Sequence, residues 1–118
     1  MTQRQFIDTY QRHFHETFER VLDTYEVQNA KYNYSWLNDG LDTRALFAEV
    51  NAKFQRLKTL AWTNYCQLAD DKKSLAAFGD TIDDMILYLA MMRERYVEEN
   101  PEVGMLLDDL TRKQRDET

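Results

Sequence analysis

Three charged residues, Glu49, Lys53 and Arg56, recur at a spacing that places them on one side of a predicted helix. Each helical residue turns about 100°, so the three side chains share a stripe about 60° wide beside the apolar face. Such a stripe lies at the seam between packed helices, where a carboxylate can bind a metal ion and two cations can bind phosphate oxygens. The same spacing also fits an exposed Glu49–Lys53 pair, which stabilises a helix by about 0.2–0.5 kcal/mol.

A second stripe lies on a later predicted helix, where Asp80 and Asp84 are four residues apart and Tyr88 follows after four more. Asp84 adjoins the apolar run from Met85 to Met92 and therefore faces desolvation. An unpaired buried charge is costly, so this carboxylate requires a partner. The sequence offers three: Lys53, Arg56 or a bound cation.

The two stripes leave two interpretations open. In the first, Asp84 pairs with a basic residue only to hold two helices in register. In the second, Glu49, Asp80 and Asp84 converge on one divalent ion. Mg²⁺ takes oxygen ligands from several elements together with the phosphates of its substrate, so this interpretation predicts a magnesium nucleotide as ligand.

Aromatic residues mark the segment from Lys31 to Gly40, which ends in the turn-forming run Asn-Asp-Gly. Tyr32, Tyr34 and Trp36 alternate there with polar residues. Aromatic side chains in a loop either stack on a nucleobase or fix the loop against the core. The sequence therefore places Tyr32 and Trp36 among the candidate nucleotide-binding residues, beside Lys53, Arg56 and Tyr88.

Long helices must position these residues. Apolar side chains at steps of three and four predict helices over residues 5–29, 42–69 and 74–99. Pro101 ends the third helix, because the residue before a proline disfavours helical geometry. A short fourth helix is expected over 103–110 and a charged, disordered tail over 111–118. The predicted fold is thus an all-α helical bundle of one domain, residues 1–110.

The run from Met85 to Met92 is apolar on nearly every side of its helix. A helix without a polar face must be covered on several sides, which makes this helix the centre of the bundle. Two other long helices cover it poorly. We therefore expect a homo-oligomer.

Composition excludes several classes of function. The formal charge of −6 disfavours a nucleic-acid polymer as partner. The single cysteine, Cys66, excludes an internal disulfide and fits a reducing compartment. No stretch has the length of a membrane span or the apolar core of a signal peptide, so the sequence predicts a cytoplasmic protein. Neither a glycine-rich phosphate loop nor a motif for a serine or cysteine nucleophile is present.

Several of these positions together resemble the nucleotide modification associated domain family of phages and bacteria. The resemblance covers roughly residues 14–92. It rests on Tyr32-x-x-Ser35-Trp36, on Glu49-Val50-x-x-Lys53-x-x-Arg56-Leu57 and on Asp80-Thr81-x-x-Asp84-x-x-x-Tyr88. The chain departs from the family at Lys31-Tyr32-Asn33, where the family often has Asp-Tyr-Gly. The resemblance implies a link to nucleotide metabolism and supplies no reaction.

A looser resemblance is to the MazG-like all-α nucleoside triphosphate pyrophosphohydrolases, whose third helix is similar to Asp84-Met-Ile-Leu-Tyr-Leu. Those enzymes hold Mg²⁺ through an E-x-x-E helix and an E-x-x-D helix. Here Glu49 lacks the second glutamate of the first motif, and Thr81 stands where the glutamate of the second would be. The resemblance therefore implies a metal site with fewer carboxylates than those enzymes have.

Three functions follow as hypotheses. The first is a nucleotide-binding helical protein that binds or sequesters a small nucleotide. The second is a Mg²⁺-dependent nucleoside triphosphate pyrophosphohydrolase, in which Glu49, Asp80 and Asp84 hold the metal and a metal-activated water attacks a phosphoryl group. The third is a non-catalytic module whose acidic surface binds another protein.

Overall fold

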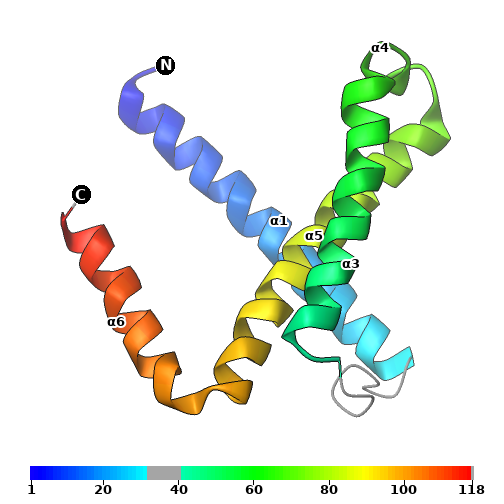
Figure 1. The fold of residues 1–118 in the computed structure, drawn as a ribbon. Coiled ribbons are helices and arrows are strands. Elements are labelled where there is room, and N and C mark those ends of the chain that lie inside the picture. The colour runs from blue at the N-terminus through cyan, green and yellow to red at the C-terminus, as the bar shows by residue number, and fades with distance from the viewer. Residues whose placement is uncertain (32–40, 118) are drawn as a thin grey trace.

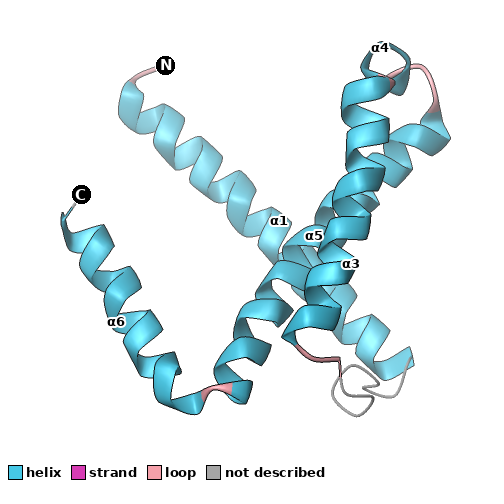
Figure 2. Ribbon diagram, in the orientation of Figure 1, coloured by secondary structure: helices cyan, strands magenta, loops and turns pink. Residues whose placement is uncertain are grey.

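The part of the chain that the structure describes is helical, and short turns join the helices from α3 (Thr43–Lys58) onward (Figures 1 and 2). The computed structural model describes the backbone of residues 1–31 and 41–117, and the side chains of 1–27 and 41–117. Tyr32, Tyr34 and Trp36 lie outside these ranges. The elements follow in this order: α1 (Gln3–Lys31), α3 (Thr43–Lys58), the π-helical turn η1 (Thr59–Thr63), α4 (Tyr65–Leu68), α5 (Lys72–Glu99) and α6 (Pro101–Glu117). The prediction of an all-α bundle is confirmed.

Aspartates begin two of the helices. The carboxylate of Asp42 accepts a hydrogen bond from the amide of Ala45 at 2.8 Å and so caps α3. Asp71 caps α5 by accepting from the amide of Lys73 and from the hydroxyl of Ser74. Each carboxylate satisfies an amide that the first helical turn leaves without a partner. These caps place the start of α3 where the sequence predicts it and the start of α5 two residues earlier.

The predicted helix over 42–69 is interrupted. After Lys58 the backbone widens into η1, in which the amide of Asn64 donates to the carbonyl of Thr59 at 3.0 Å. This bond spans five residues instead of four, so the turn holds one more residue than an α-turn. The short α4 follows before the chain reverses into α5 (Figure 1). The apolar residues whose spacing predicted one continuous helix therefore lie in three elements, α3, η1 and α4.

Helix α5 lies at the centre, as predicted. Helix α3 runs along it, and α1 crosses it (Figure 1). Among the side chains that the structure describes, the buried core is small, with Val21, Leu46, Leu87 and Met91. Leu46 of α3 has no exposed surface at all. The apolar run of α5 is covered only in part, because Leu87 and Met91 are buried whereas Leu89 is 44% exposed.

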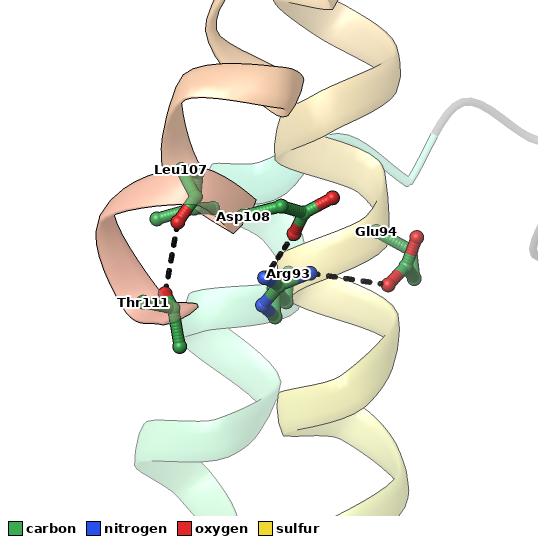
Figure 3. Close-up of polar contacts among 5 residues, drawn as sticks. All are labelled: Arg93, Glu94, Leu107, Asp108 and Thr111. Atoms are coloured by element: carbon green, nitrogen blue, oxygen red, sulfur yellow. Dashed lines mark hydrogen bonds and ion pairs between the residues drawn. The ribbon is translucent and has the colours of Figure 1, made fainter. Parts of the chain in front are cut away.

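The C-terminal helix is longer than predicted. Pro101 begins α6, which continues to Glu117 instead of ending near residue 110, so 111–117 are helical and form no separate tail. Proline suits the first position of a helix because its missing N–H would have no helical partner there. Farther along, Arg93 of α5 donates to Asp108 at 2.7 Å (Figure 3). This contact joins α6 to α5 at Asp108, three residues before the charged segment begins.

No helix in the ranges that the structure describes is both long and apolar enough to cross a membrane.

Candidate functional site

The candidate site lies at the seam where α3 runs along α5. Lys53 of α3 places its Nζ atom 3.4 Å from Oδ2 of Asp84 on α5. The two side chains are 24% and 30% exposed, so the pair lies at the edge of the packed interface and is still reached by water. Asp84 thus has the basic partner that its position requires. Lys53 pairs across the seam with Asp84, and no ion pair joins it to Glu49 on its own helix.

Tyr88 lies beside this pair, four residues along α5 from Asp84. Its phenol is partly buried, and this burial raises its pKa above the ordinary value of 10.0. The negative charges of Glu49 and Asp84 raise the pKa further, because they disfavour a phenolate next to them. We call Glu49, Lys53, Asp84 and Tyr88 the seam cluster. It unites residues of both predicted stripes.

Two other predicted residues remain at the margin. Arg56 and Asp80 are both exposed. Within residues 1–27 and 41–117, neither forms an ion pair or a side-chain hydrogen bond. Arg56 lies one turn from Lys53 along α3, so its guanidinium remains available for an anion near the seam cluster. Asp80 lies one turn before Asp84, toward the start of α5.

The carboxylates do not form a metal-binding group by themselves. Among the residues described, no three acidic, histidine or cysteine side chains lie close enough to hold a metal ion. Glu49 and Asp84 act on the same phenol, but Lys53 already neutralises Asp84. A magnesium ion would have to take most of its ligands from phosphate oxygens and water. The predicted ion therefore stays a prediction.

Thr81 is one reason why the seam offers few side chains that could bind a metal ion. Its side chain is 2% exposed, and its hydroxyl donates to the carbonyl of Ala77 at 2.6 Å. This is the position that corresponds to a glutamate of the E-x-x-D motif in the MazG-like resemblance. A buried hydroxyl bonded to its own helix cannot replace a carboxylate that reaches a metal.

Sequence reasoning missed the polar contact that joins α1 to α5. Asp83 accepts two hydrogen bonds from Arg20 of α1, each at 3.0 Å. This bidentate contact and the charge of Asp83 raise the pKa of Arg20. The two residues are 63 positions apart, so no local spacing could reveal their pairing.

A second missed set of contacts fixes the beginning of α3 against the end of α5. The carboxylate of Glu99 accepts from the amide and the hydroxyl of Thr43, at 2.9 and 2.8 Å. Arg95 donates from Nε to the carbonyl of Leu41 at 2.9 Å. Both ends of the seam are thereby constrained, since the α3–α5 connection through η1 and α4 closes its other end (Figure 1).

The fold and the site define the protein as an all-α helical protein. Its seam cluster carries charges of both signs and lies between the antiparallel helices α3 and α5. Comparisons with models of protein families, with curated proteins and with solved structures found no match to this chain. The resemblance to the nucleotide modification associated domain family consequently rests on the residues quoted above and remains an expectation.

Proposed function

We propose that this chain binds a nucleotide, as its magnesium complex, at the seam between α3 and α5. The observation that carries the proposal is the Lys53–Asp84 pair beside Tyr88, which is held between two helices and is still accessible. In this proposal Lys53 and Arg56 bind phosphate oxygens, and Tyr88 contacts the nucleoside. Both cations come from one helix and lie one turn apart, which suits adjacent phosphates.

The charge of the site argues for a magnesium complex over a free nucleotide. Glu49 and Asp84 balance Lys53 and Arg56, so the local formal charge is zero. A site without net positive charge does little to offset the charge of a bare triphosphate, whereas bound Mg²⁺ neutralises part of that charge and attracts the carboxylates. Binding is therefore expected to depend on Mg²⁺ even though the chain supplies few of its ligands.

A pyrophosphohydrolase is the second candidate. The charges of Glu49 and Asp84 both raise the pKa of Tyr88, so two of the three carboxylates predicted to bind metal lie near the same phenol. Against this stands Thr81, which is buried and bonded within α5 where those enzymes have a glutamate. We therefore favour binding without turnover, and we make hydrolysis an outcome of the same experiment.

The oligomer that the apolar run of α5 predicts also remains a proposal. One chain leaves Leu89 of that run 44% exposed, and large apolar side chains on α1 and α6 are exposed as well. A second copy would bury surface that water now covers.

The test is a panel of nucleoside mono-, di- and triphosphates, with and without Mg²⁺, read by thermal shift and by calorimetry. A ligand that binds the folded state raises the Tm by mass action. We expect at least one nucleotide to do so with Mg²⁺, and Lys53→Met and Arg56→Met each to weaken its binding about tenfold, as the loss of one charged hydrogen bond predicts. Arg44→Met, which removes an exposed charge from another side of α3, is the matched control.

Pyrophosphate and phosphate release are measured in the same samples. Release that disappears in Asp84→Asn would favour the enzyme over the binder. If no nucleotide shifts the Tm and none is hydrolysed, the nucleotide proposal fails and an acidic protein-interaction module remains. Circular dichroism of each variant separates loss of binding from loss of fold.

A further inference from the structure

The N-terminal half of α1 carries an apolar stripe that none of the other helices described in the structure covers. Phe6, Tyr10, Phe14 and Phe18 are each between 46% and 56% exposed. The ring centroids of Phe6 and Tyr10 are 4.6 Å apart and those of Tyr10 and Phe14 are 6.1 Å apart, and Tyr10 also meets the ring of His13 of the same helix at 5.9 Å. In Figure 1 this half of α1 extends beyond the crossing with α5. We call residues 3–18 the α1 arm.

The same stripe is buried farther along the helix. Residues four apart advance by about 40°, so Val21 falls between Tyr10 and Phe14 when the helix is viewed along its axis. Val21 is only 5% exposed and belongs to the core with Leu46, Leu87 and Met91. One apolar face therefore begins in solvent and ends in the core, which indicates that its outer half is also built to be covered.

Charge is kept off this face. The charged residues of the α1 arm are Arg4, Asp8, Arg12 and Glu16, which follow one another at steps of four on the opposite side of the helix. Two are positive and two negative, so the arm is neutral in a chain whose formal charge is −6. Aromatic residues without charged neighbours are typical of the centre of a protein interface. A neutral arm also approaches a second copy of itself without repulsion.

The amount of exposed surface fits a permanent interface. The accessible surface is 9531 Å², whereas a compact protein of this mass exposes about 6,700 Å². The radius of gyration is 17.3 Å, compared with about 13–14 Å for a compact domain of this length. The excess of about 2,800 Å², taken over the whole chain, exceeds the roughly 800 Å² that each partner buries in a standard interface, so one chain exposes enough surface for such an interface.

From these observations we infer that the α1 arm is a self-association surface, and that two copies pair through it in antiparallel orientation about a two-fold axis at Tyr10. Phe6 and Phe14 lie at equal spacing on either side of Tyr10. An antiparallel copy therefore brings Phe6 of one protomer to Phe14 of its partner and the two Tyr10 rings side by side, which is the self-complementarity that a two-fold interface requires.

The helix dipoles favour the same orientation. They oppose each other in an antiparallel pair and reinforce each other in a parallel one.

The first test is the mass of the full-length chain by light scattering after gel filtration. We expect twice the 14.1 kDa of one chain for the wild type at micromolar concentration. Tyr10→Glu places two like charges at the axis and should give a monomer. His15→Glu adds the same charge on the far side of the same exposed helix and should remain dimeric. A monomeric wild type, or equal behaviour of the two variants, would overturn the proposal.

The second test reads the orientation directly by cysteine cross-linking. Cys66 is exposed, so each variant also carries Cys66→Ser. On mild oxidation, Tyr10→Cys should form a disulfide-linked dimer by itself, because the axis brings this position close to its own copy. Phe6→Cys should link only when mixed with Phe14→Cys. Efficient self-linking of Phe6→Cys would show a parallel pair and contradict the inference.

Discussion

Asp83 and Asp84 are adjacent in the sequence, yet each binds a different helix. Asp83 accepts two hydrogen bonds from Arg20 of α1, whereas Asp84 pairs with Lys53 of α3. Neighbouring residues of a helix point about 100° apart, so two consecutive carboxylates can serve two different partners. Helix α5 thereby sets the positions of both α1 and α3, and the seam cluster depends on a helix that is held from two sides.

A first prediction concerns the small core. Leu46→Ala should lower the free energy of unfolding by about 2–5 kcal/mol, because it leaves a cavity at a side chain with no exposed surface. Phe47→Ala, at the next position, removes a larger side chain that is mostly exposed in one chain and should cost much less. Urea denaturation followed by circular dichroism measures both. Equal losses for the two variants would mean that Phe47 is buried in the native assembly.

The second prediction concerns the close approach of α5 and α6. A Cβ atom at Gly104 would come within 2.6 Å of Cγ1 of Val97, a stiff β-branched side chain. Gly104→Ala should therefore destabilise the protein by about 1–3 kcal/mol through overpacking.

Gly79→Ala is the matched control for that change. Gly79 lies inside α5, and a Cβ atom there meets nothing within 4 Å. Alanine should stabilise the helix by roughly 0.5–1 kcal/mol, since glycine loses more backbone entropy on folding. Opposite signs in thermal unfolding are expected, and a stabilising Gly104→Ala would show that α6 does not pack as described.

The third prediction concerns the acidity of Tyr88. Burial first, and then the charges of Glu49 and Asp84, raise its pKa. Glu49→Gln should move the pKa of Tyr88 back toward its ordinary value, whereas Asp80→Asn should leave it unchanged. An NMR titration of ring-labelled tyrosine gives the value for this one residue. Because the folded state favours the neutral phenol, this contribution to stability is present below pH 10 and is lost as the pH rises through the raised pKa.

The fourth prediction concerns acid and the cap of α5. Hydrogen bonds from Ser74 and Lys73 lower the pKa of Asp71 below its ordinary value of 3.8. The stabilisation by this carboxylate is therefore present above that value and is lost as the pH falls through the lowered pKa. Asp71→Asn keeps a capping side chain without a titrating group. Between pH 6 and pH 2.5 the Tm of the wild type should fall further than that of the variant, after correction for acid effects shared by both. Parallel curves would refute the role assigned to Asp71.

Local patterns in the sequence predict much of the fold. The apolar spacing predicts the long helices, and Asp42 and Pro101 mark helix boundaries because their effects act within one turn. The interruption at η1 could not be predicted, because Leu57, Ala61, Tyr65 and Leu68 continue the steps of three and four through it. The length of α6 was also underestimated. Its charged end has no apolar residue in 111–118, so it lacks the apolar spacing by which a helix is recognised in the sequence.

The candidate site was predictable in part. The spacing of Glu49 and Lys53, and that of Asp84 and Tyr88, shows which residues share a helix face, because helical geometry is fixed. That spacing does not show which face of α3 packs against which face of α5. Asp80 belongs to the same stripe as Asp84, yet only Asp84 reaches a residue of α3.

The sequence alone therefore determined the helical class, the main boundaries and the membership of each stripe, since all of these depend on interactions within a few residues. The tertiary structure decided which stripes meet, which carboxylate receives Lys53 and how much of the apolar face of α1 stays uncovered. Those outcomes depend on the crossing of helices far apart in the chain, and packing sets that crossing through contacts that no local pattern encodes.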